Sequence, residues 1–258
     1  MTPMNTPHPL IKNPHLEGDA FHWPAGRTGI LLIHGLTATT AEMRPLAKRL
    51  HAKGFTIAGP VLPGHNTRPE DLNTVHWRDW VATVEQAYAA LAARCDRVFV
   101  GGESTGGVLS FYLGIHHPEI AGILTYAPAL KLQLTTFEKL QLRLLAPLIP
   151  YRPRIEAEDD GLAWKGYQVI HLRGALQLIR MSDYVQARLA EIRRPVLVIQ
   201  GRLDETVHPE VPEMILNQVS SVLKEAHWME HSRHCVVLDQ ELDQVTELTL
   251  DFIAKVQG

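Results

Sequence analysis

Short apolar runs alternate with longer amphipathic stretches along most of this 258-residue chain. The apolar runs are Gly29–Ile33, Phe55–Ala58, Arg97–Gly101, Gly122–Tyr126, Pro195–Gln200 and Glu225–Met229. Continuous apolar runs of this length are typical of strands that are buried on both faces. Apolar residues recur at helical spacing over Thr40–Lys53, Trp77–Ala93 and Asp239–Val256. The alternation predicts an α/β fold, with a mostly parallel central sheet and helices on both of its faces.

The composition excludes several kinds of partner. The 25 basic and 28 acidic residues give a net charge of −3, so we expect neither nucleic acid nor an anionic lipid surface as a partner. No apolar run reaches the roughly 18–20 residues of a membrane span, and residues 1–18 lack the apolar core of a signal peptide. Cys95 and Cys235 lie far apart in the sequence. One bridge between them is possible, but two free thiols in a cytoplasmic protein are the simpler interpretation.

One segment interrupts the alternation. Lys131–Glu191 separates two predicted strands by about sixty residues, far more than a crossover connection needs. Open α/β sheets bind their ligands at the carboxyl ends of the strands. We therefore predict a core domain of residues 1–130 and 192–258 and a small helical cap of residues 131–191. The first part of the segment is rich in leucine, and a cap lined by leucines would select apolar substrates. The alternative is an extra helical layer that fills core space.

The clearest chemical motif is the G-x-S-x-G of Gly102–Gly106, between a strand-like run and a helix-like stretch. This context is that of a nucleophile elbow, in which a serine occupies a strained strand-to-helix turn. Gly102 and Gly106 provide the small residues that such a turn needs, because strand and helix approach each other closely there. We predict Ser104 as the nucleophile. The alternative is a glycine-rich turn that carries an idle serine.

A serine nucleophile needs a histidine base, and the base needs an orienting acid. In this arrangement the acid follows the serine along the chain, after a late strand. Asp204 follows the strand-like Pro195–Gly201 and is the predicted acid. Its neighbour Glu205 is the alternative, although we expect Glu205 to lead into a helix over Thr206–Ser220.

The base is expected in the loop after the last strand, where local pattern leaves His231 and His234 both open. Together with His227, these histidines also raise the question of a zinc site. No HExxH motif or cysteine pair accompanies them, and a strand-to-loop position is not a helical face that carries two histidines. We therefore predict no metal.

Acyl transfer also requires backbone amides that stabilise the developing oxyanion. The residue after the nucleophile usually supplies one, here Thr105, and an early loop supplies the other. After the strand Gly29–Ile33, Gly35 permits a tight backbone and makes the N–H of Leu36 the second candidate. His34 in the same loop is predicted to have a structural, loop-packing role.

Together these residues resemble the carboxylesterase and monoacylglycerol lipase group of α/β-hydrolases over nearly the whole chain. The matching segments are His34–Thr37, Met43–Leu46, Leu62–His65, Arg68–Leu72, Gly102–Gly106, Gly201–Glu205 and Ser232–Asp239. The resemblance implies an α/β-hydrolase fold, with His234 as the catalytic histidine, Asp204 as the acid, and Leu36 and Thr105 as the oxyanion amides. It also implies hydrolysis of short- to medium-chain carboxylic esters or monoglycerides, small molecules with an apolar acyl chain, without a cofactor.

The sequence departs from this group at three positions. Members often have Gly-Leu-Ser-Met-Gly or Gly-His-Ser-Met-Gly at the elbow, whereas here Glu103 and Thr105 flank the serine. Asn66 replaces the last glycine of Gly-His-Gly, and asparagine tolerates a left-handed backbone, so we expect the turn to survive.

Two alternative functions remain open. One is hydrolysis of amides or carbamates, or acyl transfer, by the same triad, and the other is a non-catalytic ligand receptor on a hydrolase scaffold.

Overall fold

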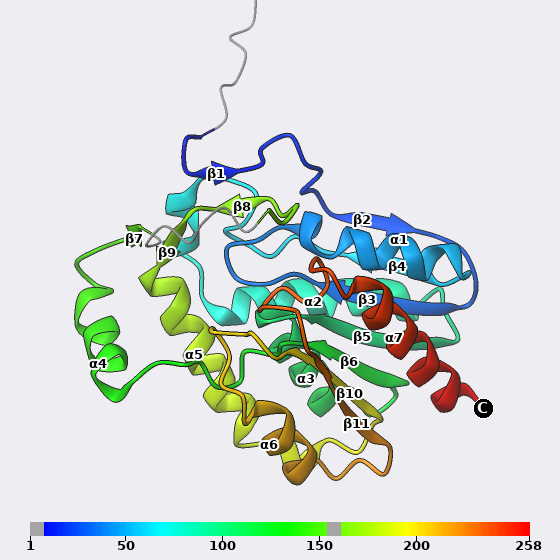
Figure 1. The fold of residues 1–258 in the computed structure, drawn as a ribbon. Helices are drawn as coiled ribbons and strands as arrows, with labels where there is room; N and C mark the ends of the chain where they lie inside the picture. The colour runs from blue at the N-terminus through cyan, green and yellow to red at the C-terminus, as the bar shows by residue number, and fades with distance from the viewer. Residues whose placement is uncertain (1–7, 154–160) are drawn as a thin grey trace, which may run out of the picture.

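The computed structural model describes residues 8–153 and 161–258. Within these residues one sheet has seven strands, in the order β11-β10-β6-β5-β3-β4-β2 (Figure 1). Their bounds are β2 Phe21–Trp23, β3 Thr28–Ile33, β4 Thr56–Gly59, β5 Arg97–Glu103, β6 Gly122–Tyr126, β10 Val196–Gly201 and β11 Lys224–Met229. Neighbouring strands are parallel, except that β2 runs antiparallel to β4. The predicted, mostly parallel sheet is confirmed.

Helices cover both faces of the sheet, as predicted. On one face lie α1 (Arg44–Ala52) and α7 (Leu242–Gln257), and on the other lie α2 (Trp77–Ala92), α3 (Thr105–His116), α5 (Leu172–Gln186) and α6 (Val211–Gln218). The apolar residues of β3 alternate between the two layers: Leu31 and Ile33 pack with the α2 side, and Ile30 and Leu32 with the α1 side. The double burial explains why the strands are uninterrupted apolar runs.

The predicted cap segment, residues 131–191, contains two helices joined by short strands. In addition to α5 it holds α4 (Thr136–Leu145), β7 (Tyr151–Pro153), β8 (Gly166–Tyr167), β9 (Val169–His171) and the short 3₁₀ helix η3 (Leu189–Glu191). Strand β7 pairs with β9, and β8 pairs with β1 (Ile11–Lys12) near the amino terminus. Residues 154–160 of this segment lie outside the described residues. In Figure 1, α4 lies at the left edge, with α5 between it and the sheet.

The leucines of α4 do not line an interior, contrary to the expectation of a leucine-lined cap. Leu142 is buried against α5, and Leu145 is half-buried in the same contact. The other large apolar residues here are exposed, namely Phe137 at 67%, Leu140 at 52%, Leu144 at 63% and Leu148 at 79%. An isolated helix that packs on one neighbour buries only the stripe that faces it.

None of the helices in the described ranges is long and apolar enough to cross a membrane.

Two helix boundaries differ from prediction. The predicted helix over Thr40–Lys53 is divided into the 3₁₀ helix η1 (Thr40–Glu42) and α1, which begins with Pro45 in its first turn. A further 3₁₀ helix, η2, spans Pro69–Asn73. The helix predicted over Thr206–Ser220 begins only at Val211. The N–H groups of Thr206 and Val207 instead donate to the side chain of Asp204, so this stretch is a loop around that carboxylate.

Candidate active site

Ser104 lies on a strained turn between β5 and α3. Its backbone φ is +53°, a left-handed value that serine rarely adopts. Glycines allow the turn: a Cβ added at Gly106 would lie 2.0 Å from the carbonyl oxygen of Ile33, and one at Gly102 would lie 2.3 Å from the same atom. The predicted need for small residues at both positions is therefore confirmed, and Ser104 has the geometry of a nucleophile elbow.

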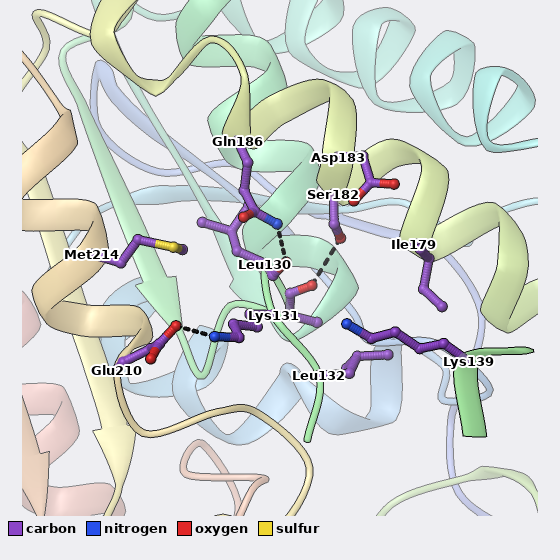
Figure 2. Close-up of a pocket in the computed structure, with 11 residues that line it drawn as sticks. Leu130, Lys131, Leu132, Lys139, Ile179, Ser182, Asp183, Gln186, Glu210 and Met214 are labelled. Atoms are coloured by element: carbon purple, nitrogen blue, oxygen red, sulfur yellow. Dashed lines mark hydrogen bonds and ion pairs between the residues drawn. The ribbon is translucent and has the colours of Figure 1, made fainter. Parts of the chain in front are cut away.

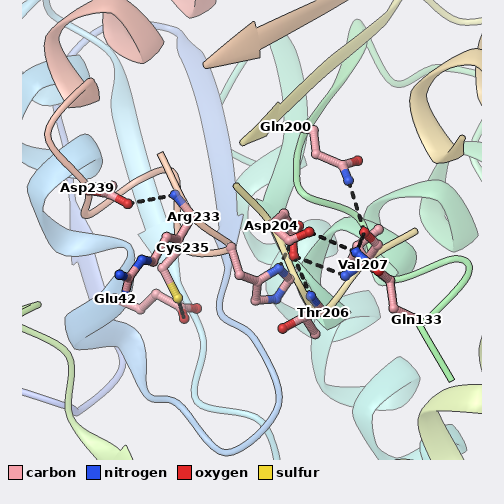
Figure 3. A network of polar contacts seen from close by, with 10 residues as sticks. Glu42, Gln133, Gln200, Asp204, Thr206, Val207, Arg233, Cys235 and Asp239 are labelled. Carbon is pink, nitrogen blue, oxygen red and sulfur yellow. Dashed lines mark hydrogen bonds and ion pairs between the residues drawn. The ribbon is translucent and has the colours of Figure 1, made fainter. Parts of the chain in front are cut away.

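Asp204 and His234 are brought together from separate loops. His234 Nδ1 lies 2.9 Å from Asp204 Oδ2, and the side chain of Asp204 is 1% exposed. The other carboxylate oxygen accepts the N–H groups of Thr206 at 2.8 Å and Val207 at 3.0 Å, as Figure 3 shows. Two backbone donors and the histidine therefore hold this carboxylate in one orientation. The rival residues Glu205 and His231 are both exposed at the surface.

The elbow and the histidine loop, which is the loop after β11 that carries His234 and Cys235, converge on the loop after β3. A Cβ added at Gly35 would lie 3.4 Å from Ser104 Cβ and 3.2 Å from Glu42 Oε2. The thiol of Cys235, the neighbour of His234, donates to the other oxygen of Glu42 at 3.8 Å. In the described chain no hydrogen bond joins the Ser104 hydroxyl to His234. Such bonds are often long in structures without substrate and shorten in the substrate complex.

The two predicted oxyanion amides flank this meeting point. Thr105 is the first residue of α3 and is fully buried, and Leu36 directly follows Gly35 in the loop after β3. The Gly35 N–H is occupied, because it donates to Glu42 Oε2 at 2.6 Å. This bond fixes the backbone from which the Leu36 N–H extends. The position of each amide relative to a substrate oxygen stays a prediction.

His34 packs the loop after β3, as predicted. Its ring is fully buried, and its Nε2 accepts the N–H of Leu62 at 3.1 Å. Because that nitrogen accepts, the proton of the neutral ring is on Nδ1, which donates to the Gly35 carbonyl at 2.8 Å. Burial lowers the pKa of His34 to about 4. His34 therefore holds the loop as a neutral ring and is not the base.

The turn that contains Asn66 also keeps the expected geometry. Asn66 has φ of +54° and Gly64 has φ of +81°, both in the left-handed region. His65 between them is buried, and its Nδ1 lies 3.1 Å from the Pro63 carbonyl. The expectation that asparagine preserves this turn is confirmed.

Glu103, the charged departure at the elbow, is completely buried at the end of β5. Neither of its carboxyl oxygens has a hydrogen-bond partner within the described residues. Burial raises the pKa of Glu103 well above its ordinary value, and the charges of Glu42 and Asp204 raise it further, while the Val237 backbone acts in the opposite direction. Glu103 is therefore a buried acid with a raised pKa, directly before Ser104 in the chain.

Two supporting residues had no local signal in the sequence. Glu42 contacts Gly35 in the loop after β3 and Cys235 beside His234, as described above. Gln133, at the start of the predicted cap, donates through Nε2 to the carbonyl oxygens of Asp204 at 2.8 Å and Val207 at 3.1 Å (Figure 3). More than 70 residues separate Gln133 from these partners, so only the folded chain reveals the contact.

The three clustered histidines do not converge on one point. His227 pairs with Glu225 on β11 at 3.1 Å, His231 is exposed, and His234 faces Asp204. Over residues 8–153 and 161–258, no group of three histidine, cysteine, aspartate or glutamate side chains is arranged to hold a metal ion. His227 and His234 therefore contact different carboxylates.

A cavity of about 270 Å³ lies beside the elbow, between α5, α6 and the segment after β6 (Figure 2). Its walls combine apolar and charged side chains, namely Leu130, Leu132, Ile179 and Met214 with Lys131, Lys139, Asp183 and Glu210. The N–H of Ala129, on its wall, donates to the Ser104 carbonyl at 3.1 Å. Ser104, Asp204 and His234 do not line it.

The chain is similar to several known proteins over nearly its whole length. A family model described as serine aminopeptidase, S33, matches residues 25–241. The thermostable monoacylglycerol lipase of Bacillus sp. (strain H-257) is 34% identical, over 95% of this chain and 98% of that protein. The carboxylesterase of Bacillus subtilis (strain 168) is 28% identical, over 92% and 96%. A solved structure from work on LipS and LipT, two metagenome-derived lipolytic enzymes, has a TM-score of 0.86 at 32% identity, over 93% and 99%. This chain belongs to the serine aminopeptidase S33 family of α/β-hydrolases.

Proposed function

We propose that this protein is a serine carboxylic-ester hydrolase that acts on short- to medium-chain esters or monoglycerides. The observation that carries the proposal is the 2.9 Å contact of His234 Nδ1 with the buried Asp204, in a loop that meets the strained Ser104 turn. The similarity to a monoacylglycerol lipase and a carboxylesterase supports the ester class of substrate.

In this mechanism Ser104 Oγ attacks the ester carbonyl while His234 Nε2 accepts its proton. Asp204 keeps the Nδ1 proton of His234 in place and stabilises the imidazolium that forms. The N–H groups of Leu36 and Thr105 stabilise the tetrahedral oxyanion. His234 returns the proton to the leaving alcohol, which releases it and leaves Ser104 acylated. Water activated by His234 then frees the acid, so no cofactor is needed.

The same assignment leads to proposals about the cap segment, the acyl chain of the substrate and the location of the protein. Residues 131–191 are proposed to cover the site, which is supported by the bonds from Gln133 in this segment to the Asp204 loop. The similarity to a monoacylglycerol lipase supports a substrate with an apolar acyl chain. Cys95 and Cys235 both have free thiols, which supports a reducing, cytoplasmic location.

The test is Ser104→Ala, assayed with p-nitrophenyl esters from acetate to palmitate and with a monoglyceride. We expect kcat/KM to fall about a thousandfold or more, because no other group replaces the nucleophile. A fluorophosphonate should label the original chain and not the variant. The control is Ser220→Ala, at an exposed serine whose hydroxyl donates to the Ala190 carbonyl. Full turnover by Ser104→Ala, with its fold intact, would refute the assignment.

Amide hydrolysis is the second candidate, and the description of the matching family as an aminopeptidase is what favours it. A p-nitroanilide that matches the best ester distinguishes the two, since faster turnover of the anilide would replace the ester proposal. A fold-intact protein that turns over neither substrate and resists the fluorophosphonate would instead be a ligand receptor.

A further inference from the structure

The first residues of the predicted cap segment pair with the loop after β10, which carries the predicted acid. Leu132 and Val207 form an antiparallel bridge between the two segments. Backbone hydrogen bonds flank this bridge, from the Gln133 N–H to the Thr206 carbonyl at 2.9 Å and from the His208 N–H to the Lys131 carbonyl at 2.8 Å. The cap segment is therefore joined to this loop through its backbone before α4 begins at Thr136.

The side chain of Gln133 adds two more bonds to the same loop. Its Nε2 donates to the Asp204 carbonyl at 2.8 Å and to the Val207 carbonyl at 3.1 Å, as Figure 3 shows. Val207 is fully buried, and its carbonyl also accepts Gln200 Nε2 at 3.3 Å. One side-chain amide therefore bonds to the backbone of the loop at two points, one of them on the predicted acid itself.

A single peptide group connects Gln133 with the carboxylate of Asp204. This group consists of the Thr206 carbonyl and the Val207 N–H. Its carbonyl accepts the Gln133 N–H, and its N–H donates to Asp204 Oδ1 at 3.0 Å. Hydrogen bonds in such a chain polarise one another. The other carboxylate oxygen faces His234 Nδ1 at 2.9 Å, so a continuous chain of hydrogen bonds leads from Gln133 to the predicted base.

We propose that Gln133 is a positioning residue, through which the cap segment fixes the orientation of the Asp204 carboxylate toward His234. The proposal rests on the proposed ester hydrolysis, because Gln133 acts through the triad. Gln133 takes no part in proton transfer, since its amide donates to carbonyl oxygens throughout the reaction. Without this donor the loop gains freedom, and Asp204 holds the Nδ1 proton of His234 in place for less of the time.

Gln133→Met tests the proposal, because it removes the donor and keeps the length of the side chain. Gln133 is exposed, so the substitution disturbs no core and the variant should fold. We expect kcat for the best p-nitrophenyl ester to fall about tenfold with KM little changed, because small displacements of catalytic groups cost rate. The matched control is Gln257→Met at the end of α7, which removes a side-chain bond to Thr28 and should leave kcat unchanged.

Gln133→Glu separates the donor from the space that the side chain fills. It keeps the size of the side chain but places an acceptor oxygen against the Asp204 and Val207 carbonyl oxygens. We expect its kcat to fall further than that of Gln133→Met. A kcat of Gln133→Met equal to that of the original chain would overturn the proposal. A rise in KM with kcat unchanged would also overturn it, because Gln133 would then bind the substrate and not position the acid.

Proton NMR examines the bond between Asp204 and His234 without any need for activity. The Hδ1 proton of His234 should give a far-downfield resonance, identified by its loss in His234→Gln. This resonance should move upfield in Gln133→Met and stay in place in Gln257→Met. An unmoved resonance in Gln133→Met would overturn the proposal. If the original chain hydrolyses no ester but the resonance moves in Gln133→Met, the proposed function fails while the positioning by Gln133 stands, so the two failures are distinguishable.

Discussion

Single glycines at the elbow decide how closely the loop after β3 approaches Ser104. The backbone of Ile33, which leads into His34 and Gly35, occupies the space that a side chain on Gly106 would need. The contact is with backbone atoms, which cannot rotate away as a long side chain can. Gly106 therefore affects the loop after β3 as directly as it affects the turn around Ser104.

Gly106→Ala should impair activity and stability together. The added methyl group must displace Ile33 and the Leu36 amide that follows, so we expect kcat to fall about a hundredfold and the free energy of unfolding to fall by about 1–3 kcal/mol. The matched control is Gly174→Ala in α5, where the nearest atom is on the flexible side chain of Leu72, at 3.3 Å. Denaturant unfolding and ester turnover measure both effects. Equal behaviour of the two variants would contradict the steric argument.

At the scale of elements, α4 packs on α5 and exposes most of its apolar residues. It is well defined locally, because Thr135 forms a capping box with Glu138. Its packing depends on Leu142 and Leu145 against α5, while most of its apolar residues face outward. Helix periodicity in the sequence indicates a helix but does not indicate how many sides of it are covered.

Polar substitution on the outer face of α4 should therefore leave stability almost unchanged. We make Phe137→Ser, Leu140→Ser and Leu144→Ser singly. Apart from the cost of the lower helix propensity of serine, we expect each to change the free energy of unfolding by no more than about 0.5 kcal/mol. Leu142→Ala, the buried control on the same helix, should cost about 2 kcal/mol. Urea denaturation provides the measurement. Losses on the outer face as large as that of Leu142→Ala would mean that another part of the chain covers it.

At the scale of the whole molecule, buried neutral histidines connect stability to pH. Burial lowers the pKa of His34 to about 4 and lowers the pKa of His65 well below its ordinary value. Between about pH 6.5 and pH 4 the unfolded chain binds protons at these positions that the folded chain does not bind. Their stabilising contribution is therefore complete above pH 6.5 and is lost as the pH falls. For His34 the shift corresponds to roughly 3 kcal/mol.

We predict that the free energy of unfolding decreases steeply between pH 6.5 and pH 4, and urea titrations at several pH values measure it. Protonation of His34 Nε2 would point a proton at the Leu62 N–H, which now donates to it. His34→Gln should be less stable at pH 7 but should show a shallower decrease toward pH 4. An equal slope in the two proteins would assign the acid sensitivity to other groups.

Much of this architecture was predictable because it depends on local pattern. The six predicted strands all occur in the sheet, with ends that differ by at most two residues. For the inner strands the reason is that uninterrupted apolar runs require burial on both faces. The elbow was predictable because the left-handed turn at Ser104 depends on residues close to it in the sequence, above all Gly102 and Gly106. The helix over Thr206–Ser220 was wrong in its first turn, because Asp204 captures the Thr206 and Val207 amides before a helix can use them.

Sequence by itself determined the alternating strands and helices, the small residues around Ser104 and the acidic character of the Asp204 loop. The local pattern did not decide whether His231 or His234 is the predicted base. Tertiary structure distinguished them, because only His234 faces Asp204 while His231 is exposed. Tertiary structure also left Leu140 and Leu144 of α4 exposed and brought Gly35 and Cys235 to the carboxylate of Glu42. These outcomes depend on contacts between residues far apart in the chain, and the periodicity of neighbouring residues does not contain that information.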